Sequence, residues 1–414
     1  MKLHGLYPRH RLDIYIHDLL YGFSACLWAR DDRKFADDIL RICSLENEGL
    51  ICLSVRSGWD LLLRALAWSP DGEVLVSAVT HPDMVRVIEH HGLRAVPVDL
   101  DPATLESRME SLEEAISPRT RAILVAHLFG GSIDLAPFAA FARRHRLLLI
   151  EDCAQAFRGA DEMGDALADV SMFSFGTLKT ATAAGGAILC IRDLILREKM
   201  LRIQEGWPMQ RRRDHAARLL KILSLVILGR PLPYRVLVGV CGLLGKNPDT
   251  LVNNAVRAFP HSVDRLPNGL HRRPSPPLLA LLSRRLRCFD IDRLSRRAAT
   301  GEEVAGNLPE ALQHPGSFSR SRTHWIFPVV VPKPEAFILT LRRQGFDASR
   351  ATSNIAAVRT SGFPEPEAAS RMMSKVVFLP VYPEIPDEAR ERLIRALKNF
   401  AGDSAIPVRE GSRV

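Results

Sequence analysis

The chain has 414 residues, 47% of them hydrophobic and 25% charged, so its composition is that of a globular protein and excludes disorder. This length supports a large core and favours two subdomains. The net charge of +9 permits an anionic small molecule, an anionic membrane surface or a nucleic acid as partner. Only 7% of the residues are aromatic and no basic run is interleaved with them, so we expect no nucleic-acid partner.

The seven cysteines are scattered along the chain, and no pair has C-x-x-C or zinc-site spacing. We therefore expect a reduced, cytoplasmic protein without a structural metal. Residues 1–23 mix charged and apolar side chains and lack the apolar core of a signal peptide.

Residues 1–50 are expected to form an irregular arm with one or two helices. An apolar helix is then predicted to open at Ser57 and Gly58. As far as residue 205, short apolar strands alternate with longer helical segments, which is the pattern of βαβ units. The expected strands cover residues 73–79, 94–100, 121–130 and 147–155, and the expected helices cover residues 82–92, 111–116 and 136–146.

This alternation predicts an α/β fold whose large domain, residues 51–205, is built on a mainly parallel sheet. Strands in which apolar residues follow one another, without alternating polar residues, indicate a sheet buried on both faces. Such sheets carry their chemistry at the carboxyl ends of the strands, where His127, Asp152 and Ser174 fall. We expect His127 to have a structural role.

Residues 206–268 are predicted to be an insertion with two apolar runs, at residues 216–229 and 236–245. Neither run reaches the ~20 residues that a membrane span needs. Two interpretations stay open. The segment is a helical hairpin packed on the protein core or a partner subunit, or residues 211–245 make a peripheral membrane contact through their arginines and leucines.

Residues 269–414 predict an interdomain helix and a smaller C-terminal α/β domain. The helical spacing runs without a break over residues 278–308. Strands are expected at residues 324–331 and 375–383, and helices at residues 334–345 and 386–400.

The polar residues at the strand ends predict a site for pyridoxal 5'-phosphate (PLP). Lys179 would form a Schiff base with the aldehyde of PLP, and burial would lower the pKa of its amine. Asp152 would hold a proton on the pyridine nitrogen, which makes the ring an electron sink. Gln155, three residues further on, would donate a hydrogen bond to the ring oxygen.

The remaining candidate ligands surround the phosphate and the ring face. A helix opened by Ser57 would offer the amides of Gly58 and Trp59 to the phosphate dianion. Ser174 would add a hydroxyl group, and His81 would lie flat on the ring.

The segment EDCAQAFRG, followed by SFGTLK at Ser174–Lys179, resembles the E-D-x-A-Q-A-x-G … S-F-x-x-x-K signature of the DegT/StrS family of sugar aminotransferases. The resemblance is strong over residues 50–200 and weak over residues 265–400. It implies the PLP-dependent transferase fold type I and a homodimer with active sites at the subunit interface. It also implies amination of a keto-sugar with glutamate as the usual donor.

The family's G-x-N-Y-R stretch, which reaches the cofactor of the neighbouring subunit, corresponds to Gly269, His271 and Arg273 here, with histidine in place of asparagine. Three features depart from the family pattern. The glycine-rich segment after Lys179 is one residue shorter and lacks a glutamate, and the substrate loop reads ATSNIAAV, without the usual Tyr-Pro and His. Residues 206–260 are longer and more apolar than the family pattern implies, and together with the altered loop they argue against the usual nucleotide-sugar substrate.

The sequence therefore predicts a PLP-dependent aminotransferase that aminates a keto-sugar or a lipid-linked, hydrophobic keto compound. Another PLP reaction, such as dehydration or decarboxylation, is one alternative. Because family dehydratases replace the lysine by histidine, Lys179 argues against that branch. A non-catalytic regulatory relative is the other alternative, and the retained Lys179, Asp152 and Gln155 argue against it.

Overall fold

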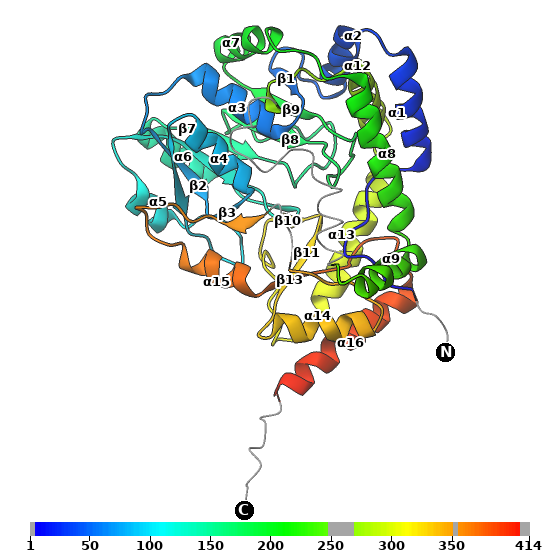
Figure 1. Ribbon diagram of the computed structural model, residues 1–414. Helices are drawn as coiled ribbons and strands as arrows, with labels where there is room; N and C mark the ends of the chain where they lie inside the picture. The colour runs from blue at the N-terminus through cyan, green and yellow to red at the C-terminus, as the bar shows by residue number, and fades with distance from the viewer. Residues whose placement is uncertain (1–4, 247–268, 351–354, 406–414) are drawn as a thin grey trace, which may run out of the picture.

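A seven-stranded sheet forms the centre of the first half of the chain (Figure 1). The computed structural model describes residues 5–246, 269–350 and 355–405. The strand order is β1-β9-β8-β7-β5-β2-β4. The strands are β1 (Gly49–Cys52), β2 (Glu73–Ser77), β4 (Arg94–Val98), β5 (Thr120–Ala126), β7 (Leu148–Asp152), β8 (Val170–Ser174) and β9 (Ala187–Ile191).

The five neighbouring strands from β8 to β4 are parallel, and β9 and β1 are antiparallel to their neighbours. The prediction of an α/β fold with a mainly parallel sheet is therefore confirmed. Every residue of β2 and β9 is buried, as expected for strands covered on both faces.

Helices cover both faces of the sheet. One face carries α3 (Val55–Leu66), α4 (Pro82–His90) and α7 (Leu194–Glu205), which share a core cluster with Val74 and Val76. The other face carries α5 (Met109–Ala115) and α6 (Ala136–His145), which pack with Leu75. Successive residues of β2 thus point to opposite layers, as the pleat of a strand requires.

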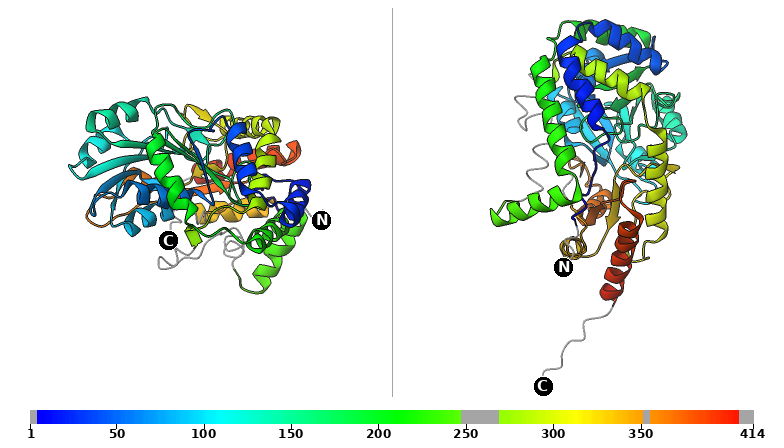
Figure 2. Two further views of the ribbon diagram at one scale, coloured as in Figure 1. Left: turned by 90° about the horizontal axis from the view of Figure 1, so that it is seen from above. Right: turned by 90° about the vertical axis from the view of Figure 1, so that its right-hand side faces the viewer.

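The N-terminal arm contains two helices, α1 (Ile16–Trp28) and α2 (Asp32–Ile42), as predicted. Both pack against α12 (Pro276–Arg287), and α1 also packs against α8 (Arg212–Leu228). Figure 2 shows α9 (Pro231–Leu243) turning away from the end of α8. The bend between the two helices is 98°. In the described residues no single helix is long and apolar enough to cross a membrane, although α8 and α9 together pass that test by length and composition.

The helix predicted over residues 278–308 is broken in two, and α13 (Ile291–Gly306) follows α12 after three residues. Asp290 causes the break, because its Oδ1 accepts a hydrogen bond from the backbone N–H of Arg293 at 2.8 Å and caps the second helix. The periodicity of apolar residues continues through this turn, so the pattern alone did not reveal the break.

The C-terminal region has its own core, formed by residues such as Phe327, Phe337 and Leu397. It contains the antiparallel pair β11 (Phe327–Val330) and β13 (Val376–Leu379), and the helices α14 (Pro334–Arg343), α15 (Glu367–Lys375) and α16 (Asp387–Ala405). Two short pairs tie it to the sheet region: β3 (Val79–Thr80) with β12 (Ala356–Ala357), and β6 (Gly131–Ser132) with β10 (Ser321–Arg322). These pairs place the segment that contains Trp325 beside the carboxyl edge of the sheet.

Candidate active site

Lys179 lies on a closed loop between β8 and β9. The backbone N–H of Phe175 donates to Gly186 O at 3.0 Å, and Phe175 O accepts from the N–H of Gly185 at 3.1 Å. Lys179 N–H donates to Gly176 O at 2.9 Å and forms a tight turn. Ala184 adopts a φ of 63°, a left-handed conformation that costs a non-glycine residue about 1–2 kcal/mol. The chain therefore holds the lysine in a fixed and locally strained loop.

The N-terminal arm and Trp325 hold this loop from outside. The carbonyl oxygen of Leu178 accepts hydrogen bonds from His10 Nε2 at 3.2 Å and from Trp325 Nε1 at 2.9 Å. The N–H of Ala181 donates to Asp13 Oδ2 at 3.1 Å. Residues far apart in the sequence thus determine where the lysine side chain stands.

The amine of Lys179 stands 4.2 Å from the centre of the Trp325 ring. Burial lowers the pKa of this amine to about 8, the carboxylate of Asp152 raises it, and the charge of Arg56 lowers it. A larger share of the amine is therefore neutral near pH 8 than for an exposed lysine, and the neutral amine is the nucleophilic form.

Asp152 ends β7 and lies in the same pocket as Lys179. Its side chain is buried, and Oδ1 accepts a hydrogen bond from the N–H of Ala154 at 2.9 Å. Burial raises the pKa of this carboxyl group, while the Ala154 hydrogen bond and Lys179 lower it. A buried carboxylate facing an open pocket is stabilised by a cationic partner, which a protonated pyridine nitrogen would supply.

Gln155 and Ser174 also line this pocket. The Oε1 atom of Gln155 accepts a hydrogen bond from the N–H of Phe129 at 2.9 Å. With its oxygen engaged there, the amide nitrogen of Gln155 supplies the donors that remain for a ligand. Ser174 ends β8, five residues before Lys179, and offers its hydroxyl group.

The helix start beside the pocket differs from the prediction. Ser54 is the N-cap of α3, because its Oγ accepts a hydrogen bond from the N–H of Ser57 at 3.2 Å, so the helix begins at Val55 and not at Ser57. The N–H of Gly58 already donates to Ser54 O at 3.0 Å. The open amides of the first turn are therefore those of Val55 and Arg56, which line the pocket together with Ser54.

Ser57, Gly58 and Trp59 do not line the pocket. Ser57 is fully buried, and Trp59 is buried with its Nε1 donating to Met84 O at 3.1 Å. A Cβ atom on Gly58 would lie 2.6 Å from the side chain of Leu189, so this glycine allows α3 to approach β9 closely.

Two arginines that the sequence analysis missed also line the pocket, Arg56 from α3 and Arg218 from α8. Arg56 Nη1 donates to Asp83 at 2.6 Å, and Arg218 Nη1 donates to Ala184 O at 3.2 Å. Burial lowers the pKa of Arg218, and the charge of Arg56 lowers it further. The two guanidinium groups therefore repel each other across a shared space that suits an anion.

His81 lines the pocket at the N-terminus of α4. Its Nδ1 atom accepts a hydrogen bond from the N–H of Asp83 at 3.1 Å. Burial lowers the pKa of the ring to about 3, and the charge of Arg56 adds to that shift. The imidazole is consequently neutral near pH 7. Its stacking on the PLP ring stays a prediction.

His271 and Arg273 lie outside the pocket of their own chain. His271 Nε2 is 2.9 Å from Asp60 Oδ2, and its ring stacks on Trp207 with centroids 4.8 Å apart. Arg273 lies 3.4 Å from Asp32. The contact of these residues, and of Gly269 beside them, with a partner subunit's cofactor stays a prediction.

His127 lies behind the pocket and takes part in a buried hydrogen-bond network. Its Nε2 atom is 2.8 Å from Glu151 Oε1, and its Nδ1 accepts a hydrogen bond from the N–H of Ile133. Glu151 also accepts from Ser171 Oγ at 2.6 Å. Burial opposes the ionisation of Glu151, but the hydrogen bonds from His127 and Ser171 lower the pKa of this carboxyl group to about 2. Together with Cys153, these side chains have metal-ligand spacing, and the hydrogen bonds between them account for their arrangement.

Residues 33–218 match the sequence model of the DegT/DnrJ/EryC1/StrS aminotransferase family. The chain is 33% identical to the GDP-perosamine synthase of Caulobacter vibrioides over 188 residues. These residues make up 44% of this chain and 48% of that protein. It is 36% identical over 165 residues to the UDP-N-acetyl-3-dehydro-alpha-D-glucosamine 3-aminotransferase of Acidithiobacillus ferrooxidans, covering 38% and 44% of the two chains. The matches thus span about half the length of these curated relatives.

The likeness in structure extends over nearly the whole chain. The aminotransferase TlmJ from Streptoalloteichus hindustanus superposes with a TM-score of 0.70 at 19% identity, covering 97% of this chain and 99% of that one. PseC, an aminotransferase of pseudoaminic acid biosynthesis in Helicobacter pylori, superposes with a TM-score of 0.69 at 13% identity, covering 97% and 100%. The resemblance and the fold predicted from the sequence are confirmed: residues 33–218 match the model of the DegT/DnrJ/EryC1/StrS aminotransferase family, and nearly the whole chain has the fold of the solved aminotransferases.

Proposed function

We propose that this protein is a PLP-dependent aminotransferase that moves an amino group from an amino-acid donor to a keto acceptor. The observation that carries the proposal is the meeting of Lys179, Asp152, Gln155 and Ser174 in one pocket of a chain from this family. We further propose glutamate as the donor and a keto-sugar or a hydrophobic keto compound as the acceptor.

The residues of the pocket suit PLP at its phosphate end. Arg56, Arg218, Ser174 and the first turn of α3 all line the pocket, and the charge of Arg56 acts on Arg218. A helix N-terminus and two guanidinium groups complement a phosphate dianion, and that anion would remove the repulsion between Arg56 and Arg218.

Other residues of the pocket suit the ring of PLP, which carries a positive charge on its protonated nitrogen. The carboxylate of Asp152 would complement a protonated pyridine nitrogen, the amide of Gln155 would donate to the ring oxygen, and Lys179 would be the amine that bonds to the aldehyde carbon. When bound, PLP supplies an electron sink that stabilises negative charge on the carbon next to the substrate nitrogen.

In this mechanism the protein's side chains hold and move protons. Asp152 would keep the proton on the ring nitrogen. Lys179 Nζ would remove the proton from the donor carbon that bears the nitrogen and would later deliver a proton to the acceptor's former carbonyl carbon. The lowered pKa of Lys179, about 8, suits a group that must both accept and release a proton near neutral pH.

A spectroscopic half-reaction tests the proposal. The purified protein loaded with PLP should absorb in the visible region, glutamate should bleach that band, and a keto acceptor should restore it. A stable band that no amino acid bleaches would favour another PLP reaction. A protein that takes up no PLP would favour a non-catalytic relative.

We also propose a homodimer in which His271 or Arg273 reaches the cofactor of the partner subunit. In the described residues His271 pairs with Asp60 and Arg273 pairs with Asp32. A contact with the partner's cofactor therefore requires these two side chains to share or exchange their present partners. Light scattering tests the assembly, and a monomer that transaminates would contradict it.

A cytoplasmic location with a peripheral membrane contact through residues 211–245 stays a hypothesis. One face of α8 is buried through Leu219 and Ile222, whereas Ile227 and Val236 are 50% and 66% exposed. The double change Ile227→Asp and Val236→Asp should abolish sedimentation with anionic liposomes. Ile195→Asp on α7, at an apolar residue that is 83% exposed, should leave it unchanged. Wild-type protein that stays in the supernatant at low salt would contradict the hypothesis.

A further inference from the structure

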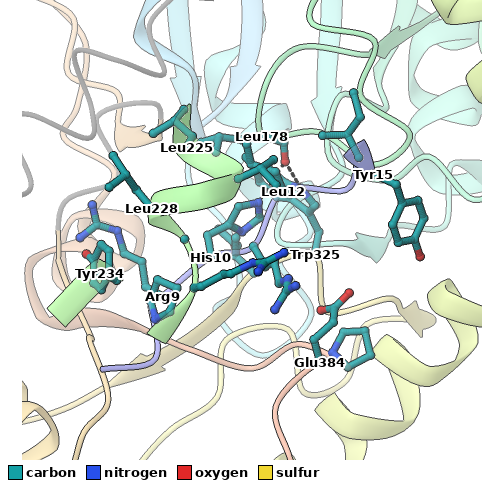
Figure 3. A pocket seen from close by; sticks show the side chains of 18 of the residues that line it. Arg9, His10, Leu12, Tyr15, Leu178, Leu225, Leu228, Tyr234, Trp325 and Glu384 are labelled. Atoms are coloured by element: carbon teal, nitrogen blue, oxygen red, sulfur yellow. Dashed lines mark hydrogen bonds between the residues drawn. The ribbon is translucent and has the colours of Figure 1, made fainter. Parts of the chain in front are cut away.

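A second cavity, shown in Figure 3, adjoins the lysine pocket at Trp325. It encloses about 490 Å³. Leu178, Trp325 and Ile355 line both this cavity and the pocket that holds Lys179. A molecule in the cavity would therefore lie close to the reactive amine, which stands 4.2 Å from the centre of the Trp325 ring.

One wall of this cavity is apolar and comes from the insertion and the N-terminal arm. Figure 3 shows the side chains of Leu12, Leu225 and Leu228 around the same opening. Leu237 of α9 continues the wall. The hydroxyl group of Tyr234, a polar group on this wall, already donates to Asp347 at 2.6 Å. The wall suits a hydrocarbon chain, since a nucleoside buried there would leave its polar groups without partners.

The rest of the lining is strongly cationic. Five arginines line the cavity, and Glu384 is the one carboxylate among its lining residues in the described part of the chain; the arginines are Arg9, Arg11, Arg230, Arg293 and Arg296. Arg293 is neutralised by Glu384 at 2.7 Å and by Asp13 at 3.4 Å. Arg9 lies 4.0 Å from Asp347.

The other three arginines, Arg11, Arg230 and Arg296, form no ion pair with any residue that the structure describes. Guanidinium groups gathered around an opening in this way recognise phosphate and carboxylate groups. The lining thus combines an anion-binding rim with an apolar wall.

Resting on the proposed aminotransferase activity, we propose that this cavity binds the non-reacting part of the acceptor and that the acceptor is an anionic amphiphile. Its phosphate group would lie among Arg11, Arg230 and Arg296, and its hydrocarbon chain would lie along α8 and α9. Exposed apolar side chains on α9, including Leu232 and Val240, continue beyond the cavity and would receive a longer chain.

Calorimetric titration of the PLP-loaded protein with four probes tests this proposal. The probes are dodecyl phosphate below its critical micelle concentration, inorganic phosphate, dodecyl maltoside and UDP. We expect dodecyl phosphate to bind at least tenfold more tightly than each of the other three. Binding of UDP that equals or exceeds that of dodecyl phosphate would overturn the proposal, as would the absence of saturable binding of dodecyl phosphate.

Matched variants locate the binding site. Leu228→Asp, inside the cavity, should weaken dodecyl phosphate binding at least tenfold, and Arg230→Gln should do the same from the rim. Leu220→Asp, on the outer face of α8 where Leu220 is 58% exposed, should leave the affinity unchanged. Equal losses in Leu220→Asp and Leu228→Asp would place the probe on the surface and contradict the proposal. Should Leu228→Asp not fold, the Arg230→Gln and Leu220→Asp pair decides.

This experiment separates the inference from the proposed function. Bleaching of the PLP band by glutamate tests transamination without the amphiphile. Dodecyl phosphate binding tests the cavity without turnover. If the protein reacts with glutamate but does not bind dodecyl phosphate, the proposed function is supported and the inference about the cavity is contradicted.

Discussion

The amine of Lys179 lies over the face of Trp325, 4.2 Å from the ring centre, and the same indole donates from Nε1 to the carbonyl oxygen of Leu178 at 2.9 Å. Trp325 therefore fixes both the backbone and the side chain at the reactive position. It also lines both cavities.

We predict that Trp325→Leu weakens PLP binding roughly tenfold, because the loop loses the hydrogen bond to Leu178 O and the lysine loses the ring that positions its side chain. Trp325→Phe, which keeps a ring face, should lose less affinity. Absorbance titration with PLP measures both variants. Wild-type affinity in Trp325→Leu would show that the ring does not position the lysine.

The pKa of Lys179 leads to a prediction about pH. Burial lowers this pKa from 10.5 to about 8, and only the neutral amine attacks an aldehyde. The rate at which the PLP-free protein takes up PLP should therefore rise between pH 6.5 and pH 8 and level off above about pH 9. Stopped-flow absorbance at fixed PLP concentration measures this rate. A profile that still rises steeply at pH 10 would indicate an unperturbed lysine.

Arg218 should act on the phosphate of the cofactor. Arg218→Ala should weaken PLP binding roughly 10- to 100-fold, the equivalent of 1.5–3 kcal/mol for charge-assisted hydrogen bonds, and leave the binding of pyridoxal, which has no phosphate, unchanged. Arg213→Ala, at an exposed arginine of the same helix, should have no effect. Parallel losses for PLP and pyridoxal would indicate that Arg218 serves only the fold.

Asp152→Asn should reduce turnover about 10²–10³-fold and leave folding intact, because the amide keeps the shape but cannot hold the proton on the ring nitrogen. The hydrogen bond from the N–H of Ala154 to the side-chain oxygen can persist in the variant. Single-turnover kinetics with glutamate measure the effect, and thermal unfolding checks the fold. Unchanged kinetics would remove Asp152 from the mechanism.

The sequence predicted those parts of the structure that depend on local patterns. Alternating apolar segments predicted the parallel sheet, and residues at strand ends, Asp152 and Ser174, predicted one side of the pocket. The start of α3 was predicted wrongly, because both Ser54 and Ser57 are plausible caps and only the hydrogen bond between them decides.

Other features depend on contacts between distant segments and have no local signature. Arg218 reaches the pocket from α8, and its sequence context is that of a surface arginine on an amphipathic helix. Trp325 arrives from a connection beyond β10, and its indole meets Leu178 only in the folded chain. The second cavity arises only where the arm, α8 and α9 meet. Such contacts follow from the packing of the whole chain.

The central claim is that Lys179, in this pocket, bonds to the aldehyde carbon of PLP. Borohydride reduces such a carbon–nitrogen double bond to a stable amine, so peptide mass spectrometry of the reduced protein can locate the cofactor. We predict one tagged peptide, containing Lys179, and no tag at that peptide in Lys179→Ala. A tag spread over other lysines, or a wild-type protein that carries none, would contradict the account.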